Sequence, residues 1–441
     1  MSALGGKKTV VLGLARSGEA AARALLDAGA SVTVLDAADG DRQRERAGNI
    51  AGARVVLGRT DPADLGDAEL VVASPGVPWS SPWIEEARRR GLPVWSEVEL
   101  AFRLGVRPLV GITGTNGKTT TTEMTVAALR AAGRDAVAAG NVGTPLVSFS
   151  PDAEIVAELS SFQLQGIDEF RVPVAVLLNV AHDHLDWHGS DEAYRRAKGR
   201  IFENQGSEDV AIVHDDPVCR ALATGKAGQV LFADDERPHG GAGVEGGWIV
   251  VPEGRVVEAD RLRARGRPNR SDAIAAAAAA CALGVEPATA GAALAAFETG
   301  RHRIEEIAVV EGVTYVNDSK ATDPHATLAA LEGMHDVVLI AGGRNKGLDL
   351  SELAAAAPHL RAVVAIGESA GEIDAAFAPA GIPVEKAGSM EDAVARAREL
   401  ADAGDTVLLS PACASFDMFT NYEERGDAFR AAVHRIEGSD Q

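Results

Sequence analysis

Short apolar runs alternate with longer stretches of helical pattern along most of the chain. Such runs, bounded by glycine, serine or proline, are typical of buried strands in a parallel sheet, and the stretches between them are typical of helices that cover the sheet. In the N-terminal part, the pattern predicts strands at 9–12, 31–35 and 71–73 and a helix at 18–28. This part ends near Val106, where Arg107-Pro108 is typical of a linker.

The same alternation continues through a central part and a C-terminal part. The central part has apolar runs at 155–157, 174–180 and 210–213, predicted helices at 122–130 and 272–283, and a polar, glycine-rich stretch at 234–247 that we expect to be an exposed loop. The C-terminal part has apolar runs at 337–341, 363–366 and 407–409. We therefore predict three α/β domains with mostly parallel sheets, at 1–106, 107–300 and 301–441.

Composition narrows the class of protein. A length of 441 residues suits roughly three domains, and a formal net charge of −21 argues against nucleic-acid binding, although local cations can still hold small anionic substrates. The three cysteines, Cys219, Cys281 and Cys413, form no C-x-x-C pair, which suits a reducing cytosol. Because we see neither a signal peptide nor a stretch of ~20 apolar residues, we expect a cytoplasmic monomer that inserts into no membrane.

Residues 111–120, Gly-Ile-Thr-Gly-Thr-Asn-Gly-Lys-Thr-Thr, lie between an apolar run and a predicted helix. Glycines at this spacing let backbone N–H groups surround a phosphate, while Lys118 can neutralise the outer phosphates and Thr119 or Thr120 can offer a hydroxyl to Mg²⁺. The loop departs from the common phosphate-loop motif because Ile112 stands where the first glycine is expected. The sequence therefore predicts a variant phosphate loop.

A second glycine-rich turn, Gly13-Leu14-Ala15-Arg16-Ser17-Gly18, follows the first predicted strand. It matches the dinucleotide fingerprint except that Ala15 replaces the middle glycine, and Asp36 ends the second strand where an acidic residue would hold a ribose. The Ala15 methyl group hinders the approach of a pyrophosphate to the backbone. The turn therefore predicts a Rossmann-like fold and favours a nucleotide other than NAD.

Polar residues also follow several later strands. Glu158 ends a strand in the same part as the phosphate loop, where it is well placed to hold Mg²⁺ opposite the loop threonine. Three of the ten histidines fall within 182–188; they could form a zinc site, a second Mg²⁺ or phosphate contact, or a surface cluster. Lys198 is by default an exposed helical lysine, and Arg303 could reach a nucleotide phosphate. The turns at 317–322 and 410–417 could together grip a small zwitterion or carboxylate.

Together these residues resemble the Mur ligase superfamily, the ATP-dependent amide-bond synthetases of peptidoglycan precursor assembly. The similarity covers essentially the whole chain. It is carried by the 113–120 loop and by Gly13-Leu14-x-x-Ser17-Gly18, Ser74-Pro75-Gly76, Glu158-Leu159-Ser160-Ser161-Phe162-Gln163-Leu164, Asp183-His184-x-Asp186, Asp318-Ser319-Lys320-Ala321-Thr322 and Ser410-Pro411-Ala412-x-Ala414-Ser415.

The resemblance implies a Rossmann-like N-terminal domain for a UDP-sugar, a central P-loop-type ATPase domain and a Rossmann-like C-terminal domain for an incoming amino acid. The motifs match best the branch of the family that joins D-glutamate to UDP-N-acetylmuramoyl-L-alanine. In that reaction ATP converts a carboxylate into an acyl phosphate, and ADP and phosphate are released.

The resemblance also implies roles for individual residues. Lys118, His184 and Lys198 would be catalytic. One Mg²⁺ would be held by Thr119 or Thr120 with Glu158, and a second by His184 and by Lys198 in carbamylated form. ATP would be bound by Gly114, Thr115, Asn116, Gly117, Lys118, Thr119, Thr120, Asn269, Arg303 and Asp318. The UDP substrate would be bound by Ser17, Asp36, Ser74 and Asn141, and D-glutamate by Lys320, Thr322, Ser415, Phe416 and Tyr422.

Some positions depart from the family pattern. Trp187 replaces an arginine in D-H-x-D-R. Pro268 and Asp272, on either side of Asn269, replace histidine and asparagine. Phe416 replaces leucine and Tyr422 replaces phenylalanine, and both keep an apolar wall. The alternatives are a family member that adds a different amino acid, a folylpolyglutamate synthetase, a nicotinamide oxidoreductase based on the Gly13 turn, and a nucleotide-binding module without catalysis.

Overall fold

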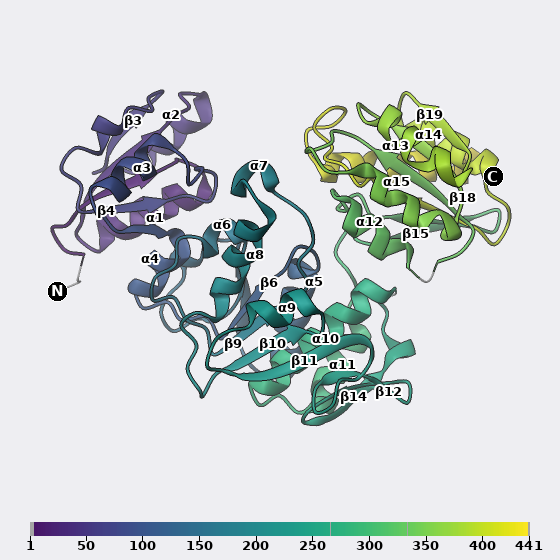
Figure 1. Cartoon of the computed structure of the whole chain (residues 1–441), viewed down its shortest axis with the longest axis horizontal. Coiled ribbons are helices and arrows are strands. Elements are labelled where there is room, and N and C mark those ends of the chain that lie inside the picture. The colour runs from purple at the N-terminus through teal and green to yellow at the C-terminus, as the bar shows by residue number, and fades with distance from the viewer. Residues whose placement is uncertain (1–3, 265, 333, 440–441) are drawn as a thin grey trace. The chain divides into compact units, whose positions relative to one another are not determined.

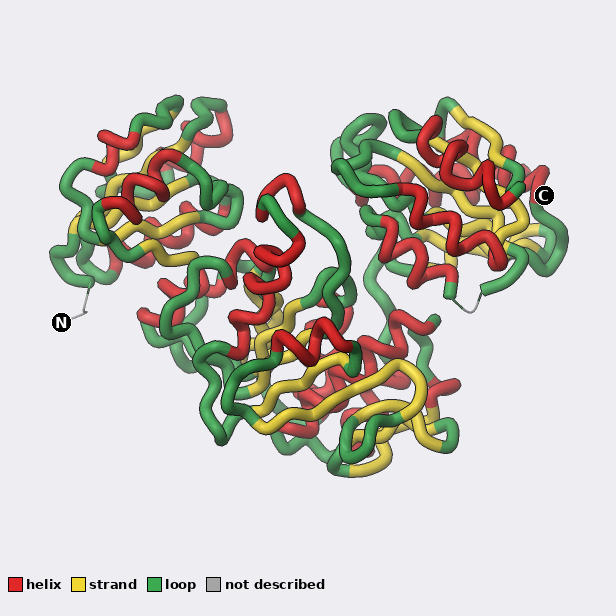
Figure 2. Tube along the Cα trace, viewed as in Figure 1, coloured by secondary structure: helices red, strands yellow, loops and turns green. Residues whose placement is uncertain are grey.

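A computed structural model describes residues 4–264, 266–332 and 334–439, and they form three sheets flanked by helices (Figures 1 and 2). The N-terminal sheet is parallel, in the order β3-β2-β1-β4-β5. Its strands are β1 (Lys8–Leu12), β2 (Ser31–Asp36), β3 (Arg54–Leu57), β4 (Leu70–Ala73) and β5 (Val94–Ser96). Its helices are α1 (Arg16–Asp27), α2 (Asp41–Gly48), α3 (Pro82–Arg89) and α4 (Glu97–Arg103). The strands predicted at 9–12, 31–35 and 71–73 are confirmed.

The central sheet has nine strands in the order β14-β13-β12-β11-β10-β9-β6-β8-β7. The strands are β6 (Val110–Thr113), β7 (Ala136–Gly140), β8 (Glu154–Glu158), β9 (Val174–Leu177), β10 (Val210–His214), β11 (Gly228–Glu236), β12 (Ala242–Glu245), β13 (Trp248–Val251) and β14 (Gly254–Glu258). The helices along this stretch are α5 (Lys118–Ala131), α6 (Ser161–Leu164), α7 (Leu185–His188), α8 (Asp191–Gly199), α9 (Pro217–Leu222), α10 (Arg267–Ala282) and α11 (Pro287–Ala296). From β7 to β12 neighbouring strands pair in parallel, whereas β12 and β13 are antiparallel.

One expectation for the central part is wrong. The stretch at 234–247 is not a loop, because it holds the end of β11 and all of β12. Each of these strands pairs with a neighbour on both sides, but most residues of β11 are exposed or half-buried, so polar and glycine residues are tolerated where a strand buried on both faces would be apolar. The helix expected at 122–130 is confirmed as part of α5, which begins earlier, at Lys118, directly after the glycine loop.

The C-terminal sheet has six strands in the order β15-β16-β20-β17-β18-β19, with β15 antiparallel to β16 and every other pair parallel. The strands are β15 (Glu305–Val310), β16 (Val313–Asn317), β17 (Val337–Gly342), β18 (Leu360–Ile366), β19 (Val384–Ala387) and β20 (Thr406–Leu409). The helices are α12 (Pro324–Leu331), α13 (Ala370–Phe377), α14 (Met390–Leu400) and α15 (Tyr422–Ser439). Short 3₁₀ helices are η1 (Pro62–Leu65), η2 (Leu146–Ser148), η3 (Arg200–Phe202), η4 (Ala259–Arg261), η5 (Leu350–His359) and η6 (Ala378–Ala380). The α/β class with mostly parallel sheets is confirmed.

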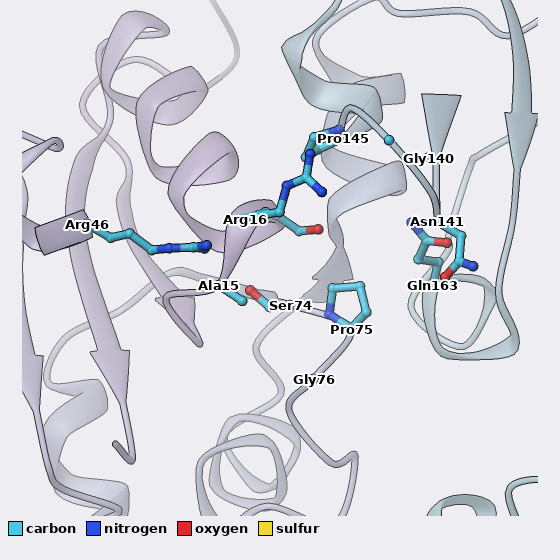
Figure 3. A pocket seen from close by; sticks show the side chains of 12 residues that line it. Ala15, Arg16, Arg46, Ser74, Pro75, Gly76, Gly140, Asn141, Pro145 and Gln163 are labelled. Atoms are coloured by element: carbon cyan, nitrogen blue, oxygen red, sulfur yellow. The ribbon is translucent and has the colours of Figure 1, made fainter. Parts of the chain in front are cut away.

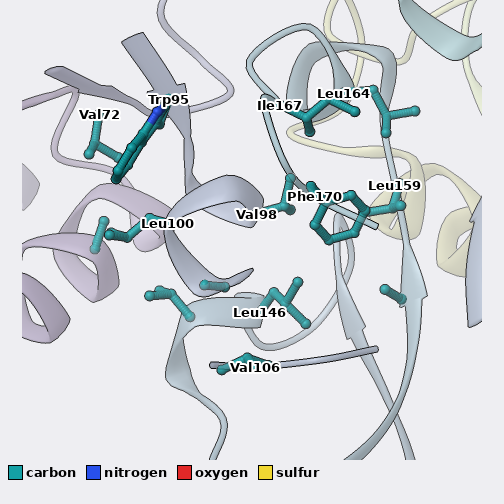
Figure 4. Close-up of a cluster of buried hydrophobic side chains, with 14 of the residues drawn as sticks. Val72, Trp95, Val98, Leu100, Val106, Leu146, Leu159, Leu164, Ile167 and Phe170 are labelled. Carbon is teal, nitrogen blue, oxygen red and sulfur yellow. The ribbon is translucent and has the colours of Figure 1, made fainter. Parts of the chain in front are cut away.

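Contacts divide the chain into two compact units. The first comprises residues 1–180, 192–257 and 273–294 and holds the N-terminal and central sheets, and the second comprises 181–191, 258–272 and 295–441. In the first unit, one apolar cluster is continuous from the N-terminal sheet, through α4, to the central sheet (Figure 4). The domain boundaries at 106 and 300 remain predictions.

None of the helices within the described ranges is both long enough and apolar enough to cross a membrane.

Candidate active site

The predicted site residues divide between the two units, and each set is described within its own unit. The first unit holds Ser17, Asp36, Ser74, the 114–120 loop, Asn141, Glu158 and Lys198. The second unit holds His184, Asn269, Arg303, Asp318, Lys320, Thr322, Ser415, Phe416 and Tyr422.

The phosphate loop joins β6 to α5, and its departure from the common motif has a structural cause. Ile112 is a fully buried residue of β6, paired with Glu158 of β8 and Val176 of β9, so the chain there is still a strand. The turn begins at Gly114, where an added Cβ would lie 3.0 Å from the Cβ of Leu178. Gly117 has a φ of +82° and directly precedes the first residue of α5. The loop therefore places the N-terminus of α5 at the carboxyl edge of the sheet, as an anion site requires.

Hydrogen bonds hold the loop in shape. The Asn179 side chain, at the end of the neighbouring strand β9, accepts from the backbone N–H groups of Thr115 (3.1 Å) and Asn116 (2.9 Å). Lys118 Nζ donates to the carbonyls of Gly114 (2.9 Å) and Thr115 (2.7 Å). Asn179 was not among the predicted site residues, because its contact with the loop depends on β9 lying next to β6 in the sheet.

Glu158 connects the phosphate loop with a second predicted residue. Its Oε2 accepts a 2.7 Å hydrogen bond from Thr119 Oγ1, and its Oε1 accepts a 2.8 Å bond from Asn141 Nδ2. The Glu158 residue is only 3% exposed. A buried carboxylate next to a threonine hydroxyl is a pair of hard oxygen donors, the kind that Mg²⁺ binds in nucleotide sites.

Lys198 is not an exposed lysine, so the default expectation for this position is wrong. It is 2% exposed and its Nζ donates a 2.5 Å hydrogen bond to the carbonyl of Gly114. Its Nζ also lies 4.7 Å from the ring centroid of Tyr194, whose hydroxyl is 3.0 Å from Thr115 Oγ1. Tyr194, Ala197 and Lys198 form the buried face of α8. That face therefore lies against the phosphate loop, and Tyr194 is a site residue that the sequence analysis missed.

A cavity of about 330 Å³ lies between the Gly13 turn and the central sheet (Figure 3). Its walls include the predicted residues Ser17, Ser74 and Asn141. Other residues in its walls were not predicted: Arg16, Arg46 and Gln163. The Gly13 turn is tightly packed, because a Cβ added to Gly18 would lie 1.8 Å from the Gly13 carbonyl, and Ser74 Oγ donates to that same carbonyl at 3.0 Å.

Asp36 lies at the end of β2, as predicted, and organises the backbone around it. Its two carboxylate oxygens accept from the N–H groups of Leu14 (2.6 Å) and Ala38 (2.8 Å). Both oxygens are thus engaged in holding the turn, and a contact between Asp36 and a ribose remains a prediction.

In the second unit, the strand-end turns at 317–322 and 410–415 are bonded to each other. The Asp318 carboxylate accepts from Ser410 Oγ (2.9 Å) and from the Ile304 N–H (3.2 Å). Burial raises the pKa of Asp318 to about 7, while the Ser410 hydrogen bond and the charge of Arg303 oppose the rise. The two residues that flank Arg303, His302 and Ile304, have φ values of +67° and +46°, a strained backbone of the kind found at functional sites.

The buried guanidinium of Arg425, on α15, fixes the same pair of turns. It donates to the Ser319 hydroxyl (3.0 Å), the Ser319 carbonyl (2.7 Å) and the Cys413 carbonyl (3.0 Å). Beside it, Lys320 Nζ lies 4.0 Å from the ring centroid of Tyr422. Ser415 is buried, whereas Phe416 is 65% exposed. The turns predicted to bind an amino acid therefore have a rigid frame, to which Arg425 contributes without having been predicted.

His184 and Asp183 lie in the segment 181–191 of the second unit. His184 has a φ of +51° and its Nε2 is 3.3 Å from Asp183 Oδ2. Lys346 Nζ is 3.8 Å from Asp183 Oδ1, which brings a cation that was not predicted next to this motif. Asn269 is buried on the first turn of α10. Among the side chains that the structure describes, no group of three or more His, Cys, Asp and Glu residues is arranged to hold a metal ion.

Three family models match successive parts of the chain. Residues 7–96 match the model described as Mur ligase MurD-like, N-terminal domain. Residues 112–280 match Mur ligase middle domain, and residues 302–413 match Mur ligase, glutamate ligase domain.

Curated relatives match almost the full length. A UDP-N-acetylmuramoylalanine--D-glutamate ligase of Frankia casuarinae is 48% identical, with 98% of this chain and 95% of the relative covered. Proteins of the same name from Pelotomaculum thermopropionicum (42% identical, 97% of each chain) and Anaeromyxobacter dehalogenans (45% identical, 97% of each chain) are also similar.

Solved structures share the fold at lower identity. A pseudomurein peptide ligase type C from Methanothermus fervidus has a TM-score of 0.61 at 18% identity, covering 98% of this chain and 100% of that one. The MurF ligase of Thermotoga maritima, solved in complex with ADP, has a TM-score of 0.60 at 16% identity, covering 92% and 95%. At these identities the likeness concerns the fold alone.

Proposed function

The chain belongs to the Mur ligase family, and we propose that it is the ATP-dependent ligase that joins D-glutamate to UDP-N-acetylmuramoyl-L-alanine in peptidoglycan precursor synthesis. The observation that carries this proposal is the position of Glu158. One of its oxygens bonds to Thr119 of the phosphate loop, and the other bonds to Asn141 in the wall of the cavity. ATP at the phosphate loop and the carboxylate of the UDP substrate in the cavity would thus both lie next to the Glu158 side chain, which stands between the two binding sites.

The chemistry follows from the low reactivity of a carboxylate toward an amine. An oxygen of the L-alanyl carboxylate attacks the γ-phosphorus of ATP, ADP leaves, and an acyl phosphate forms. The amine of D-glutamate then attacks the carbonyl carbon, phosphate leaves with one carboxylate oxygen, and the amine loses a proton. Because phosphoryl transfer needs positioning and charge neutralisation more than covalent help, the protein's task is to align the two reactants.

The phosphate loop performs that task for ATP. Lys118 bonds to two loop carbonyls, and its ammonium group can transfer to the β- and γ-phosphates, whose oxygens are stronger acceptors. Thr119 or Thr120 and Glu158 are the oxygen ligands that would hold Mg²⁺. When bound, Mg²⁺ neutralises phosphate charge. We further propose that Asn269, Arg303 and Asp318 are ATP contacts.

Lys198 and His184 would act near the γ-phosphate. Lys198 is buried against the Gly114 carbonyl, and a carbamylated Lys198 retains one N–H that can donate to this same carbonyl. The carbamate would supply an anionic oxygen ligand, and His184 an imidazole nitrogen, to a second Mg²⁺. Carbamylation would thus remove the positive charge of Lys198.

The predicted substrate-binding residues form two sets, one for each of the other substrates. Ser17, Asp36, Ser74 and Asn141 lie in or next to the cavity that would take the UDP-sugar part. D-glutamate would be bound by Lys320, Thr322, Ser415, Phe416 and Tyr422, with the Lys320 ammonium paired to a carboxylate. We place the reaction in the cytoplasm and propose that the enzyme works as a monomer.

Phosphate release in the presence of ATP, Mg²⁺ and UDP-N-acetylmuramoyl-L-alanine tests the proposal. D-glutamate should support release, whereas L-glutamate, L-alanine and L-lysine should not. Release with another amino acid, and none with D-glutamate, would favour a different member of the family. NAD should leave the melting temperature unchanged, since the Gly13 turn contains Ala15; a clear upward shift would support the oxidoreductase alternative.

A further inference from the structure

Arg46, on α2, lies in the wall of the cavity that also contains Ala15, Ser74 and Asn141. Its side chain extends from α2 toward Ala15 (Figure 3). The Nη1 atom is buried and has no hydrogen-bond partner within the described part of the chain. Burying a guanidinium N–H group without an acceptor costs free energy, and a ligand atom that accepts a hydrogen bond from it would recover that cost.

The nearest carboxylate does not satisfy Arg46. Arg46 Nε is 3.9 Å from Glu19 Oε2, which is too long for a hydrogen bond. The other oxygen of Glu19 already accepts a 2.7 Å bond from Arg23. Glu19 can therefore orient the Arg46 side chain, but it leaves the buried Nη1 available for another anion.

The adjoining helix terminus also favours an anion. α1 has 12 residues and begins at Arg16, and its N-cap residue Ala15 makes no side-chain capping bond. The partial positive charge of a helix N-terminus attracts phosphate groups. Arg16, Ala15 and Arg46 all lie in the wall of the same cavity, so a side-chain cation and a helix N-terminus are both near one ligand volume. Because the Ala15 methyl group hinders direct contact between a pyrophosphate and the backbone, the helix would act through its partial charge, and the Arg46 side chain would make the hydrogen bond.

We propose that Arg46 binds the diphosphate of the UDP substrate and determines the preference of this cavity for a phosphorylated nucleoside. This inference rests on the proposed function, which supplies a ligand with two phosphates. Arg46 takes no part in the chemistry at the L-alanyl end. Its removal should therefore weaken substrate binding and leave the rate at saturation largely unchanged.

The test compares Arg46→Gln with Arg44→Gln, a matched control on the same helix. Arg44 is exposed and pairs with Asp39 at 2.8 Å instead of lying in the cavity wall. Binding of uridine and of UDP is measured calorimetrically with ADP and Mg²⁺ at saturation, so that the phosphate loop is already filled. We expect Arg46→Gln to weaken UDP binding about 10-fold or more, the usual effect of losing a charge-assisted bond. Uridine binding should be unchanged, Arg46→Lys should restore part of the UDP affinity, and Arg44→Gln should bind both as the wild type does.

Equal UDP affinity in Arg46→Gln and wild type would overturn the inference, and so would an equal loss for uridine and UDP, which would indicate a structural or nucleoside-binding role. The binding measurement needs no turnover. If Arg46→Gln binds UDP more weakly than the wild type, but the wild type does not use D-glutamate, the proposed reaction is refuted and the role of Arg46 stands. If the wild type joins D-glutamate to the UDP substrate and Arg46→Gln has an unchanged KM for that substrate, the proposed reaction stands and the role of Arg46 is refuted.

Discussion

The hydroxyl of Thr119 donates a 2.7 Å hydrogen bond to the carboxylate of Glu158, although the two residues are 39 positions apart in the chain. This contact joins the first turn of α5 to the end of β8. Because the second oxygen of Glu158 bonds to Asn141, one buried carboxylate links the phosphate loop with the cavity that we propose for the UDP substrate. The arrangement explains how two binding sites can share one reaction centre.

Glu158→Gln should reduce kcat by roughly 100-fold or more, since it removes a negative charge next to the phosphates while keeping the shape of the side chain. The Mg²⁺ concentration that gives half-maximal activity should also be higher than for the wild type. Glu154→Gln, on the same strand but paired with Arg134 near the surface, is the matched control and should retain activity. Steady-state phosphate release over a Mg²⁺ titration gives both values, and equal behaviour of the two variants would remove Glu158 from the site.

Lys198→Ala should lose activity by ~100-fold or more, because the carbamate that we propose could no longer form at this buried position. A short carboxylic acid such as acetate or formate should restore part of it by supplying the missing anion. Arg196→Ala, on the same helix with a side chain 71% exposed, should be nearly as active as wild type. Absence of rescue at any acid concentration would count against the carbamate.

Gly18→Ala should lower the free energy of unfolding by about 1–3 kcal/mol, because the new Cβ would overlap the Gly13 carbonyl and force the Gly13 turn to move. The substitution should also raise the KM for the UDP substrate. Gly48→Ala, at an exposed helix end where an added Cβ meets nothing within 4 Å, is the control. Chemical denaturation measures the difference, and similar stability of the two variants would mean that the turn is not tightly packed.

The local patterns predicted much of this fold and part of the site. Apolar runs identified the central strands because strands buried on both faces need continuous hydrophobic sequence. They failed at 234–247, where the mostly exposed or half-buried end of β11 and the turn before β12 are polar enough to resemble a loop. The burial of Lys198 could not be deduced from its own position in the chain, because it depends on the packing of α8 against the phosphate loop.

Contacts between distant residues account for the rest. Asn179 acts on the phosphate loop only because β9 lies next to β6 in the sheet, an order that the sequence does not state. Arg425 was overlooked for a similar reason, since its two acceptors on Ser319 lie 106 positions away in the chain, and its third, on Cys413, lies 12 positions away in a different turn. Arg46 has no motif around it, and only the cavity reveals its position.

Glu97→Gln should change the pH dependence of stability. Glu97 is fully buried at the start of α4, and burial raises its pKa to about 7, although hydrogen bonds from the Val147 N–H and the Gln163 side chain oppose the rise. The folded chain therefore holds this proton more tightly than the unfolded chain, whose glutamate has a pKa of about 4.3. The stability that protonated Glu97 provides is complete below pH ~4 and is lost as the pH rises to about 7.

Glu97→Gln stays neutral, so its stability relative to wild type should increase between pH 4 and pH 8 by up to about 3 kcal/mol. Denaturation midpoints across this range measure the change. Glu399→Gln, which alters an exposed residue of α14, should give a flat difference. A flat difference for Glu97→Gln as well would show that Glu97 titrates normally in the folded protein.

The transfer of an oxygen atom tests the acyl phosphate most directly. UDP-N-acetylmuramoyl-L-alanine labelled with ¹⁸O in both carboxylate oxygens is incubated with ATP, Mg²⁺ and D-glutamate, and the released phosphate is analysed by mass spectrometry. The proposed reaction predicts one ¹⁸O atom in each phosphate and one in the new amide carbonyl, with release dependent on D-glutamate. Phosphate without label, formed at the same rate, would mean that water and not the substrate carboxylate attacks ATP, and would contradict the proposed function.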